Sequence, residues 1–210
     1  MGQGLEGLAF AGSLSEASRA SLSREVRLRR GRKNQILVQQ GDRLNDVFLL
    51  MDGVLRVYTI DPHGGEATLY RIREGEICLL SLNAAFNNER YPAWVSVESK
   101  IAHFALLPGK SLRALFPREP AIQDLLLGSL TSTVRDLLVN LDEIMTCKLS
   151  ERLERFLRRN CDPSGRIDVT HQMLANHLGV AREAVSREIL ILKGRKKVRT
   201  GRGYLQLTSL

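Results

Sequence analysis

The chain has 210 residues, of which 43% are hydrophobic and 26% are charged. These values are typical of a globular protein with one large or two small domains. No apolar run reaches the roughly 18 residues that a membrane span requires, and the start of the chain, MGQGLEGLAF, lacks the pattern of a secretion signal. The three widely spaced cysteines, Cys78, Cys147 and Cys161, fit reduced thiols better than a disulfide framework. We therefore expect a cytoplasmic protein without a membrane partner.

The charge is unevenly distributed along the chain. Residues 1–147 carry 17 Lys and Arg against 17 Asp and Glu, whereas residues 148–210 carry 14 against 6, which accounts for the whole net charge of +8. A basic third joined to a neutral remainder indicates a module that binds a polyanion, and nucleic acid is the first candidate. A basic surface that serves only solubility is the alternative.

Residues 1–24 have the weak apolar periodicity of a short helical segment, and short β-rich runs separated by turns follow. An Asp-Gly pair between two such runs, as at 52–53, favours a hairpin, and strands at this spacing are typical of a sandwich or barrel. The expected strands are 35–39, 47–51, 54–60, 67–72, 77–82, 94–97 and 101–106. We predict an α+β protein whose residues 1–118 form an antiparallel β-roll (double-stranded jelly roll) of about eight strands.

The pattern becomes helical after Pro120. Apolar residues recur every three or four positions up to residue 147, which predicts a helix roughly 40 Å long. They form two stripes. One could pack on the β-roll, and the other would then need a partner, which suggests a parallel coiled coil with a second copy of the chain. A helix buried within one chain is the alternative. The expected dimerisation helix, 119–147, carries Leu126, Leu130, Thr133, Leu137, Leu141 and Ile144 as dimer contacts, beside a second stripe of Leu127, Val134, Leu138 and Met145.

Residues 148–210 are expected to form a winged helix-turn-helix. A helix over 149–160 is followed by a short extended stretch and by Thr170, a good N-cap for the next helix. Gly179 would end that helix in a tight turn. The expected inward residues of the two short helices are Leu174, Ala175, Leu178, Val180, Ala184 or Val185, Ile189 and Leu192. In this arrangement the second helix enters the major groove of DNA.

The second helix and the segment after it carry the candidate DNA contacts. Arg can donate two hydrogen bonds to guanine and Glu can accept one from cytosine, although such residues also occur on an ordinary charged surface. The predicted base contacts are Arg182, Glu183, Ser186 and Arg187. After Lys193 the pattern indicates a two-stranded wing whose cations would follow the phosphate backbone. The predicted phosphate contacts of the wing are Arg195, Lys196, Lys197, Arg199 and Arg202.

These features resemble the Crp/Fnr family of regulators over nearly the whole chain, most specifically in Ala181–Arg187 (AREAVSR). The resemblance implies a homodimer that binds near-palindromic double-stranded DNA and acts with RNA polymerase. Glu183, Ser186 and Arg187 follow the Fnr-type pattern, which implies half-sites like TTGAT. Arg182 is the residue that the cyclic-AMP branch carries at this position, so half-sites like TGTGA remain the alternative. Thr170 and Gln172 match family positions that contact phosphates.

The sensor half departs from the cyclic-AMP branch of that family. Leu79 and Leu80 stand where the branch has Gly-Glu, and Tyr91-Pro92 stands where it has Arg-Ser, with Arg90 one residue out of register. Leucine cannot accept a hydrogen bond from a ribose hydroxyl, and proline has no N–H to donate. We therefore do not expect cyclic AMP to bind.

Other cofactors are judged from the cysteines and histidines. An iron–sulfur cluster requires several close thiolates, and none of the first 77 residues is cysteine. Haem remains a possible cofactor, because Cys78 falls where the haem-containing branch also has a cysteine. Against it, Leu80 stands near the position of that branch's haem histidine. His63 and His103 are the other candidate ligands. A buried structural Cys78 and a thiol redox switch are the alternatives. The candidate effector or redox residues are Cys78, Arg90, Tyr91 and His103.

Catalysis is not expected. Metal-dependent cupins share such β-rolls but use clustered histidines with a carboxylate, and the four histidines here, His63, His103, His171 and His177, include no His-x-His pair. No metal site, phosphate loop or nucleophile elbow is predicted. A ligand-binding subunit that regulates a partner protein is the other alternative, and it leaves the basic C-terminal third unexplained.

Overall fold

The computed structural model describes residues 8–62, 64–201 and 203–208, without the side chains of Ala9 and Ile144. Its internal contacts divide the chain into two compact units. One unit comprises the chain up to residue 59 together with 69–137, and the other comprises 60–68 together with the chain from 138 onward. Within the described residues, no helix is long and apolar enough to cross a membrane.

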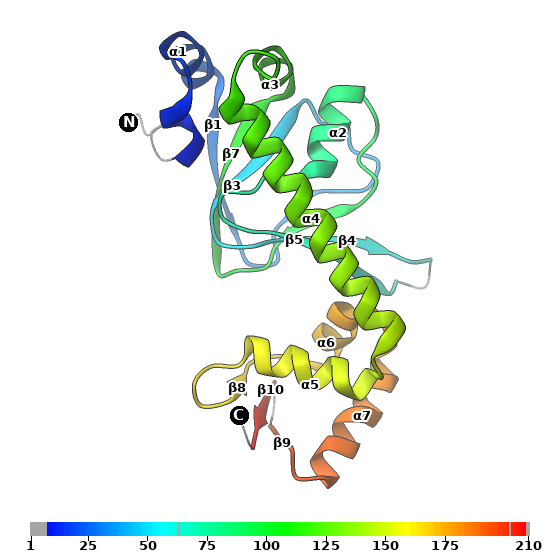
Figure 1. Ribbon diagram of the computed structural model, residues 1–210. Helices are drawn as coiled ribbons and strands as arrows, with labels where there is room; N and C mark the ends of the chain where they lie inside the picture. The colour runs from blue at the N-terminus through cyan, green and yellow to red at the C-terminus, as the bar shows by residue number, and fades with distance from the viewer. Residues whose placement is uncertain (1–7, 63, 202, 209–210) are drawn as a thin grey trace. The chain divides into compact units, whose positions relative to one another are not determined.

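Two antiparallel sheets form the N-terminal half (Figure 1). The first has the order β1-β7-β3, with β1 at Arg27–Arg32, β7 at Ile101–Pro108 and β3 at Asp46–Asp52. The second has the order β2-β6-β4-β5, with β2 at Ile36–Val38, β6 at Trp94–Val97, β4 at Leu55–Ile60 and β5 at Glu66–Ile72. These sheets confirm the predicted antiparallel β-roll, although the described part of it contains seven strands.

One expected strand is a helix. The run 77–82 begins with Ile77 in an isolated bridge to Leu49 and then turns into α2, Leu79–Asn87. Ser81 stabilises this turn, because its hydroxyl donates to the Cys78 carbonyl at 2.7 Å and accepts from the Phe48 amide at 3.2 Å. A short apolar run does not by itself distinguish a buried strand from a buried helix.

Helices cover one side of the β1-β7-β3 sheet (Figure 1). They are the short 3-10 helix η2 at Ala9–Ser13, α1 at Glu16–Glu25, α3 at Gly109–Leu115 and α4 at Pro120–Thr146. The extent of α4 confirms the predicted long helix. The core under these helices includes Leu22, Leu107, Leu112 and Ile122, all fully buried.

The C-terminal elements form a separate core. They are α5 at Leu149–Asn160, β8 at Arg166–Ile167, α6 at His171–Leu178, α7 at Arg182–Gly194, β9 at Val198–Gly201 and β10 at Tyr204–Leu207, with the sheet order β8-β10-β9. The predicted inward residues are confirmed, and Val185 is the buried member of the pair that the sequence left open. The arrangement is the predicted winged helix-turn-helix.

Candidate nucleic-acid interface and sensor core

The turn between α6 and α7 has the geometry that the sequence predicts. The Thr170 hydroxyl caps α6 by accepting from the Met173 amide at 3.1 Å. Gly179 ends α6 at φ 64°, in the left-handed region where a side chain is disfavoured. The Val180 amide then donates to the Ala175 carbonyl at 3.1 Å, which closes the turn before α7.

The outward side of α7 presents three charged side chains in its first two turns. Arg182, Glu183 and Arg187 are exposed, so the described part of the protein does not cover the side chains that would contact base edges. Ser186 is different, since it is half-buried and its hydroxyl lies 2.9 Å from Nδ1 of His171 on α6. Sequence reasoning missed His171, because no helical periodicity relates a residue of α6 to one of α7.

The predicted phosphate contacts differ in how freely they are presented. Arg195, Lys196 and Arg199 are exposed, and Arg202 lies outside the described residues. Lys197 has a partner within the protein, because its ammonium lies 2.8 and 3.0 Å from the two carboxylate oxygens of Glu154 on α5. The predicted contact of Lys197 with a phosphate stays a prediction, and it would compete with this pair.

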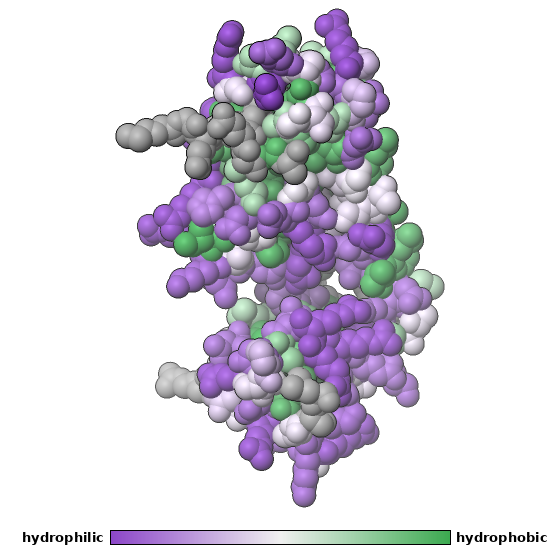
Figure 2. Space-filling model, turned by 60° about the vertical axis from the view of Figure 1, so that its left-hand side comes forward, coloured by the Kyte–Doolittle hydropathy of each residue, from purple (hydrophilic) through white to green (hydrophobic). Residues whose placement is uncertain are grey.

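Two further phosphate candidates lie at the start of α6. Thr170 uses its hydroxyl as the helix cap, and the side-chain amide of Gln172 donates to Asn176 at 2.8 Å. Both residues are exposed, and Figure 2 shows a mostly hydrophilic surface over the C-terminal unit in the lower part of the view.

Helix α4 has one apolar face that none of the described residues covers. Its exposed members are Leu127, Leu130, Val134, Leu137, Leu138, Leu141 and Met145. The predicted stripe is corrected at two positions, since Leu126 is buried in the chain's own core and Thr133 is only 9% exposed. The side chain of Ile144 is outside the described residues. The exposed face therefore combines parts of both predicted stripes.

The four candidate effector or redox residues are not brought together. Cys78 and Tyr91 are fully buried, and the Cys78 sulfur lies 3.2 Å from the Tyr91 hydroxyl and 3.9 Å from that of Tyr70. Arg90 is exposed and donates to the Gly41 carbonyl at 3.0 Å. His103 is also exposed, with Nδ1 3.3 Å from Asp52. Only Cys78 and Tyr91 of these candidates are therefore in contact with each other in the core.

The Cys78, Tyr70 and Tyr91 cluster is strongly desolvated. Burial, followed by the nearby Cys78 thiol, raises the pKa of both tyrosines far above the ordinary value of a phenol. The hydroxyls therefore stay neutral and satisfy one another and the thiol within the core.

A β-roll followed by a long helix and a winged helix-turn-helix defines a class of ligand-responsive DNA-binding regulators. Residues 28–119 match the family model of the cyclic nucleotide-binding domain, and residues 151–210 match that of the Crp-like helix-turn-helix domain. The chain belongs to the Crp/Fnr family of transcription regulators. This membership places it among DNA-binding proteins and outside the enzymes.

Solved structures share the fold at low sequence identity. A protein of Eubacterium rectale ATCC 33656 described as a Crp/Fnr-family regulator has a TM-score of 0.83 at 23% identity, covering 96% of this chain and 94% of that one. The c-di-GMP-responsive regulator CLP of Xanthomonas campestris has a TM-score of 0.79 at 16% identity, covering 93% and 100%. A Crp/Fnr-family regulator of Thermus thermophilus has a TM-score of 0.74 at 18% identity, covering 88% and 94%. A comparison with curated proteins gives no match.

The interior of this β-roll does not fit a cyclic nucleotide. The side chains of Tyr70, Cys78 and Tyr91 occupy the core between the sheets, and no Lys or Arg is buried among the described residues. A buried cyclic phosphate would therefore lack a cationic partner. The described candidates do not fit haem either, because Cys78 is enclosed by the tyrosines while His103 lies at the surface beside Asp52. His63, the other candidate ligand, lies outside the described residues.

Proposed function

We propose that this regulator binds a near-palindromic DNA site as a homodimer and that its β-roll does not respond to a cyclic nucleotide. The observation that carries the proposal is the exposure of Arg182, Glu183 and Arg187 in the first two turns of α7, directly after the Gly179 turn. These positions are where a recognition helix meets base edges in the major groove. We assign the sensor domain to 1–118, the dimerisation helix to 119–147 and the DNA-binding domain to 148–210, with RNA polymerase as the further partner.

The exposed apolar face of α4 supports the dimer. Leu127, Leu130, Val134, Leu137 and Leu141 alternate in steps of three and four residues, which is the spacing of a coiled-coil seam. A second copy of the same helix is the partner that this spacing fits, since both helices then bury identical surfaces around a twofold axis. The two recognition helices would read half-sites about 34 Å apart.

DNA titrations test the proposal directly. We would follow fluorescence anisotropy of duplexes with paired TTGAT half-sites, paired TGTGA half-sites or a scrambled sequence, all at one salt concentration. One of the two palindromes should bind at least about 1,000-fold more tightly than the scrambled duplex. Equal affinity for all three duplexes would overturn the proposal.

Two substitutions connect that specificity to α7. Glu183→Ala and Arg187→Ala should each cost about 1–3 kcal/mol on the preferred site and relax base preference. Arg158→Ala is the matched control, because Arg158 is an exposed cation at the end of α5. Unchanged discrimination in the two α7 variants would contradict the assigned contacts.

The sensor part of the proposal has its own measurement. Cyclic AMP should neither change the melting temperature nor alter DNA affinity, since the core between the sheets is filled and, among the described residues, no cation is buried. A concentration-dependent rise of the melting temperature with cyclic AMP would show binding to the folded state and would contradict this part.

A further inference from the structure

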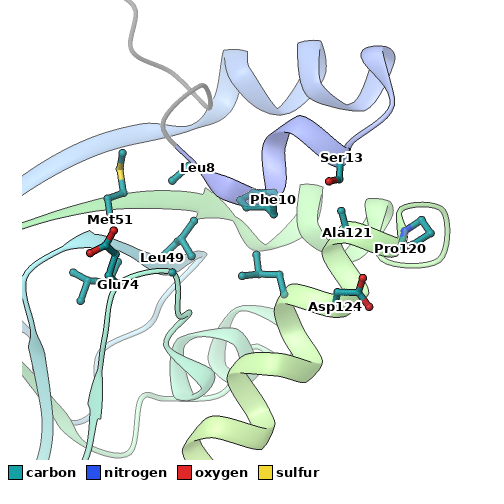
Figure 3. A pocket seen from close by; sticks show the side chains of 12 residues that line it. Leu8, Phe10, Ser13, Leu49, Met51, Glu74, Pro120, Ala121 and Asp124 are labelled. Carbon is teal, nitrogen blue, oxygen red and sulfur yellow. The ribbon is translucent and has the colours of Figure 1, made fainter.

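A cavity of about 450 Å³ lies in the N-terminal unit, apart from the filled core of the β-roll. Leu8, Phe10 and Ser13, in and beside η2, line one side, and β3 contributes Leu49, Leu50 and Met51. The other walls are Glu74 and Gly75, after β5, and Pro120, Ala121, Asp124 and Leu125 at the start of α4. Figure 3 shows this arrangement. The volume is that of a small-molecule site, and its walls are mostly apolar as such sites are.

Among the described residues that line the cavity, the charged groups are all acidic. Glu74 and Asp124 are its ionisable residues, no Lys, Arg or His lines it, and within the described part of the chain neither carboxylate has an ion pair. Figure 3 places Glu74 and Asp124 at opposite ends of a row of apolar side chains. An occupant with an apolar body and a cationic end would complement this lining.

We propose that this cavity binds a small aliphatic amine or diamine. The hydrocarbon chain would lie along Leu49, Met51 and Leu125, and the ammonium groups would face Glu74, Asp124 or both. The Phe10 ring, which is half-buried in the wall, adds a surface on which a cation or an alkyl chain can pack. A carboxylic acid of the same length would be repelled by the two carboxylates.

The walls connect the cavity to the long helix. Ala121, Asp124 and Leu125 belong to the first turns of α4. At about 3.6 residues per turn, Ala121 and Leu125 lie roughly opposite Leu130 and Leu141, whereas Asp124 lies on the same side of the helix as Leu127, one turn before it. An occupant packed on Ala121 and Leu125 would thus contact α4 on the side away from Leu130 and Leu141.

The loop that carries Glu74 is itself bound to α4. Arg73 pairs with Asp136 at 2.6 Å, the Glu76 carboxylate accepts from Ser132 at 2.6 Å, and the Ile77 amide donates to Ser129 at 3.1 Å. A ligand between Glu74 and Asp124 would therefore bias the position of α4 against the sheet. We assign this ligand the role of an effector. That role rests on the proposed DNA-binding function, whereas the binding of the ligand to the cavity does not depend on it.

Calorimetric titration of the full chain tests the site with octylamine, octane-1,8-diamine, butylamine and octanoic acid. The two C8 amines should bind with one molecule per chain, and butylamine should bind at least about tenfold more weakly because it buries less hydrocarbon. Octanoic acid should not bind. Binding of octanoic acid as tight as that of octylamine, or no binding of any amine at about 10 mM, would overturn the proposal.

Substitutions localise the binding. Glu74→Gln and Asp124→Asn should each weaken the binding of octylamine by about two- to fivefold, as expected for charge pairs with exposed residues. Asp142→Asn is the matched control, since Asp142 is an exposed carboxylate on α4 outside the cavity. Ser13→Phe, at the exposed rim, should block the cavity without altering the core. Equal weakening by Asp142→Asn, or an unchanged affinity in Ser13→Phe, would refute the site.

The effect of the ligand on DNA affinity is measured separately. Octylamine at saturation should change the apparent DNA affinity of the wild type and leave that of Ser13→Phe unchanged. If the chain bound no specific DNA, the proposed function would fail while calorimetry still decided the cavity. If amines bound and DNA affinity did not change, the effector role would be refuted.

Discussion

Ser15 and Glu119 join the starts of two helices that are far apart in the sequence. The Ser15 amide donates to one carboxylate oxygen of Glu119 at 3.2 Å, and the Ser15 hydroxyl donates to the other. The same hydroxyl caps α1 by accepting from the Ser18 amide, and Glu119 directly precedes α4. The hydroxyl of Ser15, with further hydrogen bonds at the start of α1, lowers the pKa of Glu119 below its usual value.

This pair predicts an acid-sensitive contribution to stability. Because the pKa of Glu119 is lower in the folded state, its contribution is complete above the unfolded-state pKa of about 4.3 and is lost as the pH falls through the folded-state value. Glu119→Gln should lower the melting temperature at pH 7, and the difference from wild type should shrink toward pH 3. Melting curves across this range measure it, and two parallel pH profiles would contradict it.

The exposed face of α4 predicts which leucines control association. Leu130→Lys or Leu141→Lys should raise the dimer dissociation constant by at least about 100-fold, since a lysine would have to be buried at the seam. Leu190→Lys, at an exposed apolar position on α7, should leave the dimer intact. Sedimentation velocity distinguishes the species.

A different effect is expected for Leu126, which is buried within one chain. Leu126→Ala should reduce the free energy of unfolding by about 2–5 kcal/mol through the cavity it leaves, measured by urea unfolding. A monomeric but equally stable Leu126→Ala protein would place this residue at the dimer interface instead.

The Lys197–Glu154 pair predicts unequal roles for the cations of the wing. Arg199→Ala should weaken binding to all duplexes and reduce the slope of log affinity against log salt by about 1. Lys197→Ala should change the slope less, because Glu154 already pairs with that ammonium. Glu154→Gln should strengthen binding to every duplex. Equal slopes for the Lys197 and Arg199 variants would contradict this ranking.

The His171–Ser186 contact predicts that α6 and α7 contribute to stability in a coupled way. Each of His171→Ala and Ser186→Ala should cost about 1 kcal/mol of stability, and the double variant should cost less than their sum because one hydrogen bond is lost in all three. Urea unfolding of the four proteins gives the coupling energy. Strict additivity would show that Ser186 acts on its own.

The burial of Cys78 predicts its reactivity. A thiol reagent should modify Cys147 and Cys161 rapidly in the folded protein, because both are partly exposed, and Cys78 only after unfolding. The measurement is the number of thiols titrated before and after adding denaturant. Rapid modification of all three would support the redox switch that the structure argues against.

Residues close together in the sequence were sufficient to predict the helix-turn-helix formed by α6 and α7. Thr170 and Gly179 are residue types that begin and end helices wherever they occur in such a pattern, and the apolar positions of α6 and α7 repeat with helical spacing. The limits of α5 and α6 therefore agree with expectation. The strand β1 was missed because Arg27–Arg32 contains only one large apolar residue, Leu28, and it is recognisable as a strand only through its pairing with β7.

By itself, the sequence determined the order of β-roll, long helix and winged helix-turn-helix, because periodicity and capping act between residues close in the chain. The tertiary structure decided which side of α4 is covered, that Lys197 is paired with Glu154, and that Tyr91 fills the β-roll interior beside Cys78. It also formed the cavity between η2, β3 and α4. These features depend on contacts between residues distant in the chain, and no local pattern encodes which partners meet.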